Sequence, residues 1–154
     1  MPTAERSGSR GRFSPVYAAL TLAYLLLVGR FTLADPPWLT TPNEIPGGVL
    51  ALGAWTDADT WTTGSAFEFA ANVILFAVLG FLLGRALPRA SPAALIAVSV
   101  LVTLSIEIAQ IPLPRVSDPR DLIANTMGAV VGVLITRGRT LPARTIADID
   151  RGAT

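Results

Sequence analysis

The apolar residues of this chain fall into four long blocks. These blocks cover residues 15–34, 66–86, 92–111 and 119–136. A run of roughly 18 to 20 mostly apolar residues is long enough to cross the hydrocarbon core of a bilayer as a helix. The pattern therefore predicts an all-α integral membrane bundle of four transmembrane helices, in a multi-pass protein of the cell membrane.

Local signals mark where the four helices begin. Ser14, Ser91 and Asp118 each stand directly before a proline. A capping side chain followed by proline at the first helical position is a common helix start. Ser65 and Glu68 have the spacing of a capping box at the start of the second block. Each of these signals stands directly before the first residue of a hydrophobic block.

The placement of arginine predicts the orientation in the membrane. Arginines occur before the first block, between the second and third, and after the fourth, whereas residues 35–65 contain none. Cytoplasmic segments carry the excess of basic residues. We therefore expect both termini in the cytoplasm and the long loop between the first two helices outside.

That loop has the composition of a membrane surface segment. It contains all three tryptophans of the chain, Trp38, Trp55 and Trp61. Tryptophan is enriched where the bilayer meets water. The apolar stretch 47–55 is too short to span, so we expect it to lie on the outer surface or to dip into it.

The first block has an alternative interpretation as a cleaved signal peptide. The residues "TLA" before Asp35 resemble a cleavage site. Arg30 lies close to that site and argues against cleavage. We expect the first helix to be retained.

Composition restricts the possible chemistry. The chain has no Cys and no His, and all twelve basic residues are Arg. Thiolate metal sites, histidine-based triads and lysine Schiff bases are therefore excluded. The formal net charge of +1 gives no support to a nucleic-acid partner. We expect no cofactor and no bound metal.

The predicted orientation brings polar residues of three helices into the outer half of the membrane. This candidate pocket consists of Glu68, Asn72, Glu107, Gln110, Arg115, Asp118, Asp121 and Asn125. Two glycine pairs at helical spacing, Gly80 with Gly84 and Gly128 with Gly132, predict close packing of helices.

Helix capping explains part of the polar set. Asp118 and Asp121 have the spacing of N-cap and third helical residue, and Glu68 has the same relation to Ser65. Glu107 is different, because it lies inside a helix, where capping does not apply. An ionisable side chain within a membrane helix needs a partner and is often functional. Two interpretations stay open. Glu107 pairs with Arg115 and so fixes the proline-containing segment between the third and fourth blocks, or its carboxylate faces a ligand.

The residues around Glu107 resemble the signature of the VanZ-like membrane protein family. That signature contains Glu-x-x-Gln, an Arg, Asp-x-x-Asp, Asn-x-x-Gly and a further Gly. The matching positions are Glu107, Gln110, Arg115, Asp118, Asp121, Asn125, Gly128 and Gly132. The second block is similar to the family's second helix through Asn72, Phe76 and Gly80, although Leu79 stands where a proline is usual.

The resemblance implies a multi-span bacterial protein of the cell envelope. The resemblance covers roughly residues 65–135. Together with the four predicted spans, it divides the chain into a cytoplasmic tail, residues 1–14, a VanZ-like transmembrane domain, residues 15–136, and a second cytoplasmic tail, residues 137–154. The founding member of the family is associated with low-level resistance to the glycopeptide teicoplanin. The resemblance therefore gives an architecture and a setting but no reaction.

We expect a non-catalytic role, in binding or modifying the envelope, in preference to an enzyme. Besides membrane lipid, the partner would be an envelope lipid, a glycan or another protein, held at the outer polar pocket. One alternative is an enzyme that uses the carboxylates or a hard metal ion such as Mg²⁺. Another is transport of a small ion or amine.

Overall fold

The chain folds into four long helices and three short ones. The computed structural model describes residues 12–33, 47–62, 64–113 and 116–138. The long helices are α1 (Pro15–Leu33), α4 (Ala66–Ala86), α5 (Pro92–Gln110) and α6 (Pro119–Gly138). The short ones are η1 (Gly48–Leu50), α2 (Leu52–Thr56) and α3 (Ala58–Thr62). No strand occurs in these ranges, so the predicted all-α class is confirmed.

The helix starts follow the capping signals of the sequence. The Ser65 hydroxyl accepts hydrogen bonds from the backbone N–H groups of Phe67 and Glu68, at 3.2 and 3.4 Å. The Ser91 hydroxyl accepts from Ala94 N at 3.1 Å. Each side chain satisfies N–H groups that have no partner within the helix. All four long helices begin at the predicted residues and end within two residues of the predicted ones.

Three of the long helices are suited by length and composition to cross a membrane. They are α1, α4 and α5, with mean hydropathies of 1.7, 2.2 and 2.1 over their most apolar windows. Helix α6 is as long but less apolar, because it carries Arg120, Asp121 and Arg137 besides Asn125. Three candidate membrane spans are therefore found among the described residues. The fourth predicted span, α6, is the most polar of the four long helices.

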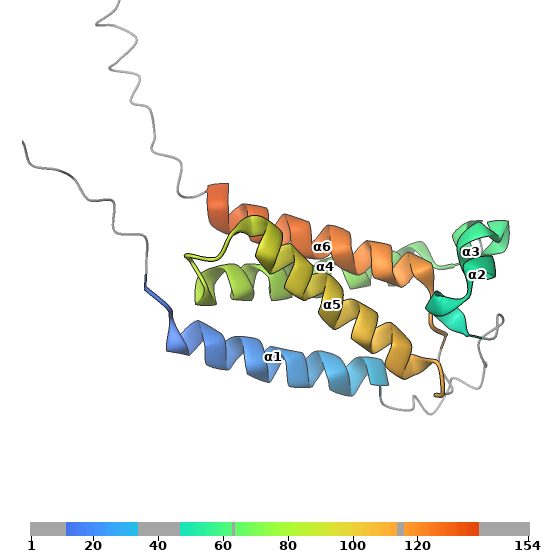
Figure 1. The fold of residues 1–154 in the computed structure, drawn as a ribbon, viewed down its shortest axis with the longest axis horizontal. Helices are drawn as coiled ribbons and strands as arrows, with labels where there is room; N and C mark the ends of the chain where they lie inside the picture. The colour runs from blue at the N-terminus through green and yellow to red at the C-terminus, as the bar shows by residue number, and fades with distance from the viewer. Residues whose placement is uncertain (1–11, 34–46, 63, 114–115, 139–154) are drawn as a thin grey trace, which may run out of the picture.

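The long helices run side by side, and the bundle has two chemically different ends (Figure 1). Helix α1 begins and α6 ends at one end, near the turn between α4 and α5, whereas α2 and α3 lie at the opposite end. We call the first the arginine end, defined by Arg12, Arg85, Arg89 and Arg137. The second is the acidic end, defined by Glu68, Glu107, Asp118 and Asp121.

Helices α4 and α6 pack backbone to backbone through four glycines. A methyl group on Gly128 would overlap the carbonyl oxygen of Val73, and one on Gly132 would overlap that of Ala77. On α4, the same test at Gly80 and Gly84 meets α6, at the backbone of Ala129 and the side chain of Thr136. Such close approach is a common way for helices to associate in membranes. It sets the position of α6, and with it the polar residues at the start of α6.

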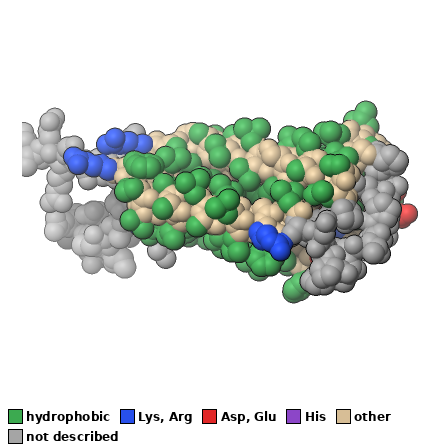
Figure 2. All heavy atoms as spheres, turned by 90° about the horizontal axis from the view of Figure 1, so that it is seen from below, with side chains coloured by type: hydrophobic (Ala, Val, Ile, Leu, Met, Phe, Trp, Pro, Cys, Tyr) green, Lys and Arg blue, Asp and Glu red, His purple; other side chains and the backbone are tan. Residues whose placement is uncertain are grey.

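The arginine end is held by contacts between side chains and backbone. The Arg137 guanidinium donates to the carbonyl oxygens of Pro88 and Ala90 in the turn between α4 and α5. The Arg85 guanidinium lies 5.0 Å from the centre of the Tyr17 ring. Along the face that includes α1, the surface between the two ends is mostly hydrophobic (Figure 2). That distribution suits a bundle surrounded by lipid.

Candidate functional site: the acidic end

The start of α6 is built by its own aspartate. Oδ1 of Asp118 accepts from the backbone N–H of Arg120 at 2.8 Å, and the Asp118 carbonyl accepts from the N–H groups of Asp121 and Leu122. These are the contacts of a helix N-cap. Capping therefore accounts for Asp118.

Glu107 is buried at the centre of the acidic end, with 2% of its surface exposed. Its Oε2 accepts from the backbone N–H of Asp118 at 2.9 Å. The Ser117 side chain forms a second hydrogen bond with the carboxylate. A buried carboxylate needs such donors because burial removes its hydration. Glu107 thus links α5 to the residues that lead into α6.

The same serine connects the carboxylate to the loop between α1 and α4. Its hydroxyl oxygen accepts from the backbone N–H of Val49 at 3.1 Å, in η1. Gly48 fits directly over Ser117, where a Cβ would collide with the serine side chain, and its φ of +50° favours glycine. The η1 segment therefore covers the buried carboxylate.

Two tryptophans extend this network to the surface. The Trp55 indole N–H donates to the Val49 carbonyl at 2.8 Å, and that of Trp61 donates to the Trp55 carbonyl at 3.2 Å. Both rings are partly exposed, at 38% and 40%. This combination of an exposed ring and a bonded N–H is typical of residues at a membrane interface. The third tryptophan, Trp38, lies outside the described residues.

A second group of polar side chains lies between α4 and α6 and is more open. The side chain of Asn72 is near enough to Asp121 to act on its charge, and both residues are half-buried. The exposed Glu68 and the half-buried Arg120 are near enough to Asp121 to act on its charge. We call these four residues the open polar cluster: Glu68, Asn72, Arg120 and Asp121.

Arg120 is held at one side of the open polar cluster. Its guanidinium donates to the Ser65 carbonyl at 3.5 Å and lies 5.9 Å from the centre of the Phe69 ring. It also packs against Gly64, where a Cβ would overlap it. A cation in this position balances one of the two cluster carboxylates.

The two remaining amides of the predicted pocket bind elsewhere. Asn125 Nδ2 donates to the Thr103 hydroxyl at 2.7 Å, joining α6 to α5. Gln110 Nε2 donates to the Thr32 carbonyl of α1 at 2.9 Å. The Oδ1 of Asn125 and the Oε1 of Gln110 are buried and have no partner within the described ranges. These bonds join neighbouring helices, as polar side chains in membrane bundles often do.

The structure thus divides the predicted pocket. Glu107 is buried under η1, whereas Glu68, Asn72 and Asp121 lie in the open polar cluster. Asp118 caps α6 between them, and the carboxylates of Asp118 and Asp121 are both near enough to Glu107 to act on its charge. Arg115, the expected partner of Glu107, lies outside the described residues. Asn125 joins α6 to α5 through Thr103, and Asn72 lies beside Asp121.

Three residues that take part in the contacts of the acidic end were not predicted from the sequence: Ser117, Val49 and Thr32. Two of them act through backbone groups, which leave no residue-type signal. Ser117 had a weak signal, because it stands directly before the capping aspartate. Within the described residues, no group of three or more acidic side chains is arranged to hold a metal ion.

Comparison with known proteins identifies the family. The sequence pattern of the VanZ/LLP1 family matches residues 16–141, which is most of the chain. No curated protein and no solved structure matches it significantly. The match includes all four long helices, except Pro15 at the start of α1, and every residue of the predicted polar pocket. The chain is a member of the VanZ/LLP1 family.

Proposed function

We propose that this chain is a non-catalytic membrane protein of the bacterial cell envelope that binds an envelope component at its acidic end. In this proposal α1, α4, α5 and α6 all cross the membrane. The acidic end faces outside, and both termini lie in the cytoplasm. The orientation is supported by the arginines that gather at the opposite end. The fourth crossing is supported by the backbone contact between α6 and α4.

The observation that carries the binding role is the open polar cluster. It holds two carboxylates, Glu68 and Asp121, near one guanidinium, that of Arg120. Glu68 is exposed, so a molecule at the membrane surface reaches it directly. One exposed and one half-buried carboxylate at the end of mostly apolar helices favour a positively charged group as the ligand.

The ligand that fits best carries an amine, and the ethanolamine headgroup of an envelope lipid is the simplest example. Its ammonium would lie between Glu68 and Asp121, and its phosphate near Arg120. Charge-assisted hydrogen bonds of this kind are about twice as strong as neutral ones. The tryptophans of α2 and α3 would hold the loop at the same level of the membrane.

Binding of the ethanolamine headgroup is expected to depend on both carboxylates. The double variant Glu68→Gln and Asp121→Asn should bind phosphatidylethanolamine about tenfold more weakly, which corresponds to about 1.4 kcal/mol. The amides keep hydrogen-bond acceptors and similar volume, so folding should be unaffected. The assay is lipid titration of the purified protein by native mass spectrometry, with phosphatidylcholine as the reference lipid.

A matched control removes an acidic charge outside the cluster. Asp57 caps α3 through Oδ1, which accepts from Asp59 N at 3.1 Å. Asp57→Asn keeps that acceptor and should bind the lipid as the unmodified protein does. Equal binding by the double variant and the unmodified protein would contradict the proposal. Chemical conversion of the bound lipid would favour the enzyme alternative.

A further inference from the structure

Three arginines that take no part in the binding site proposed above lie together at the arginine end. Arg12 precedes α1, Arg85 lies in the last turn of α4, and Arg89 lies in the turn that follows α4. The backbone N–H of Ser14 donates to the Ala86 carbonyl at 3.1 Å, which joins the segment before α1 to the end of α4. Figure 2 shows arginine side chains gathered at this end of the bundle. We call Arg12, Arg85 and Arg89 the basic cluster.

The fold fixes two members of the basic cluster. The Arg85 guanidinium lies against the Tyr17 ring, 5.0 Å from its centre. The Arg137 guanidinium donates to the carbonyl oxygens of the residues on both sides of Arg89. These contacts hold the end of α4 and the turn after it, so both arginines are placed before any ligand arrives.

The charge of the basic cluster is not balanced by any carboxylate of the described ranges. All three arginines are exposed, and Arg12 and Arg89 form no hydrogen bond or ion pair with another described residue. The acidic residues of the described ranges all lie at the opposite end of the bundle: Asp57, Asp59, Glu68, Glu107, Asp118 and Asp121. Positive charges grouped in this way attract anions.

The basic cluster lies where the headgroups of a surrounding membrane would be. Helices α1 and α4 are both long and apolar enough to cross a bilayer, and the Tyr24 hydroxyl joins them by donating to the Leu75 carbonyl at 2.8 Å. Arg12 lies three residues before α1, and Arg89 lies three residues after the end of α4. Basic side chains between the ends of neighbouring membrane helices are a known setting for anionic lipid headgroups.

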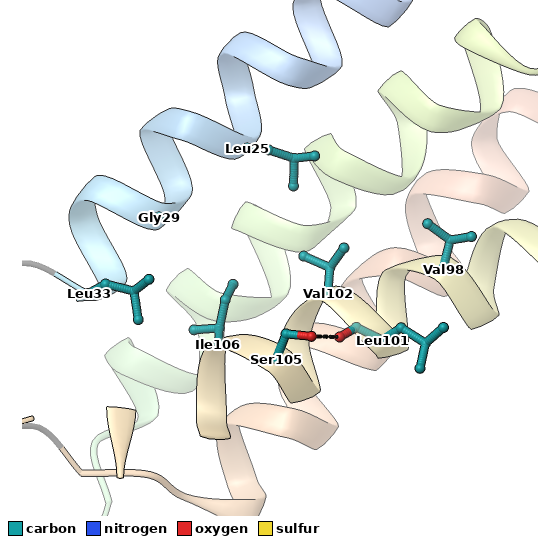
Figure 3. Close-up of a pocket in the computed structure, with 8 residues that line it drawn as sticks. All are labelled: Leu25, Gly29, Leu33, Val98, Leu101, Val102, Ser105 and Ile106. Carbon is teal, nitrogen blue, oxygen red and sulfur yellow. Dashed lines mark hydrogen bonds between the residues drawn. The ribbon is translucent and has the colours of Figure 1, made fainter. Parts of the chain in front are cut away.

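The apolar groove between α1 and α5 offers no such means of selecting a headgroup. Its lining includes Leu25, Val98 and Ile106, and none of the lining residues is charged (Figure 3). Its one hydroxyl, that of Ser105, donates to the Leu101 carbonyl of its own helix at 2.7 Å. The groove therefore does not distinguish one lipid headgroup from another, whereas the basic cluster does so by charge.

We infer that the basic cluster binds the headgroup of an anionic phospholipid, and that a headgroup with two phosphates fits it best. Guanidinium groups form charge-assisted hydrogen bonds with phosphate oxygens, often two at a time. Three positive charges exceed the single negative charge of a one-phosphate headgroup and match two phosphates more closely. The inference depends neither on the binding role of Glu68 and Asp121 nor on which side of the membrane this end faces.

The test titrates cardiolipin, which has two phosphates, phosphatidylglycerol and phosphatidylcholine into the purified full-length protein, followed by native mass spectrometry. The unmodified protein should bind cardiolipin most tightly and phosphatidylcholine least. The double variant Arg12→Gln and Arg89→Gln should bind cardiolipin about 25-fold more weakly, at about fivefold for each charge. Because neither side chain has a hydrogen bond or ion pair within the described chain, thermal stability should stay the same.

Arg30→Gln is the matched control. Arg30 is also an exposed arginine of a membrane helix, but it lies in the last turn of α1, at the other end of the bundle. Its substitution should leave the affinity for cardiolipin unchanged. A fivefold loss in Arg30→Gln would show attraction to the total charge of the protein and would overturn the inference. Unchanged affinity in the double variant would overturn it as well.

Two further arms of the titration define the ligand. Phosphatidylglycerol that binds as tightly as cardiolipin would contradict the preference for two phosphates. Inorganic pyrophosphate, added at the concentration of the lipid, should not displace cardiolipin. Displacement would assign the basic cluster to a soluble phosphate compound and would overturn the lipid as its ligand.

Discussion

Gly132→Ala is expected to destabilise the protein by about 1 to 3 kcal/mol, although it adds only one methyl group. The new Cβ would collide with the Ala77 carbonyl oxygen and the backbone nitrogen of Phe81. Both are backbone atoms of α4, so no side chain can rotate away to make room. The two helices would have to separate, and this would weaken the largest helix contact of the bundle. Thermal unfolding of the purified protein in detergent measures the effect.

Gly29→Ala is the matched control for this substitution. Gly29 also lies inside a long apolar helix, but a Cβ there meets nothing within 4 Å. Because alanine favours the helix over glycine by roughly 1 kcal/mol, this variant should be neutral or slightly more stable. Equal losses in the two variants would show that helix packing at Gly132 is not the cause.

Glu107→Ala is expected to destabilise the protein by about 3 kcal/mol. The substitution removes the acceptor of the Asp118 backbone N–H and the partner of the Ser117 side chain. It also leaves a cavity, because Glu107 is among the largest fully buried side chains. The loss of this support for Ser117 should in turn release η1, which Ser117 holds through Val49.

Two readouts separate this effect from a general loss of stability. Thermal unfolding gives the stability, and limited proteolysis within residues 47–62 reports the release of the covering segment. Glu107→Gln retains an acceptor and should recover most of both. Ser105→Ala, on the exposed side of the same helix, should change neither. An alanine variant as stable and as protease-resistant as the unmodified protein would show that Glu107 does not organise the acidic end.

The bounds of the long helices could be predicted because two independent signals coincide. Hydrophobic blocks give the lengths, and residues such as Ser65 and Ser91 give the starts. The short helices around Trp55 and Trp61 could not be predicted in the same way. They are too short for a periodic pattern, and contacts such as the bond between Trp55 and the Val49 carbonyl accompany them.

The contacts of the candidate site also could not be predicted from local sequence patterns. The sequence identified Glu107 as the residue that local structure does not explain, and the structure places it buried at the centre of the acidic end. Its described partners are a backbone N–H and a serine hydroxyl. A search for complementary charges does not find such partners, because every residue except proline has a backbone N–H. Every residue likewise has a backbone carbonyl, so the bond between Gln110 and the Thr32 carbonyl, 78 residues apart, could not be predicted from residue types.

The structure also improves the choice of positions for mapping the orientation. The chain has no cysteine, so a single introduced cysteine reports its side of the membrane without background. Ser117 lies in the hinge between α5 and α6, but it is only 4% exposed and therefore unsuitable. Val116 beside it is 45% exposed, and Asp57 is also exposed. Gly138, at the arginine end, is exposed and has open space at its Cβ position.

Cysteine labelling in intact cells tests most directly whether the acidic end faces outside, where an envelope component can reach it. A membrane-impermeant maleimide should label Asp57→Cys and Val116→Cys in intact cells. It should label Gly138→Cys only after the membrane is permeabilised. Labelling of Gly138→Cys in intact cells, together with protection of the other two positions, would contradict the proposed orientation and the binding role that depends on it.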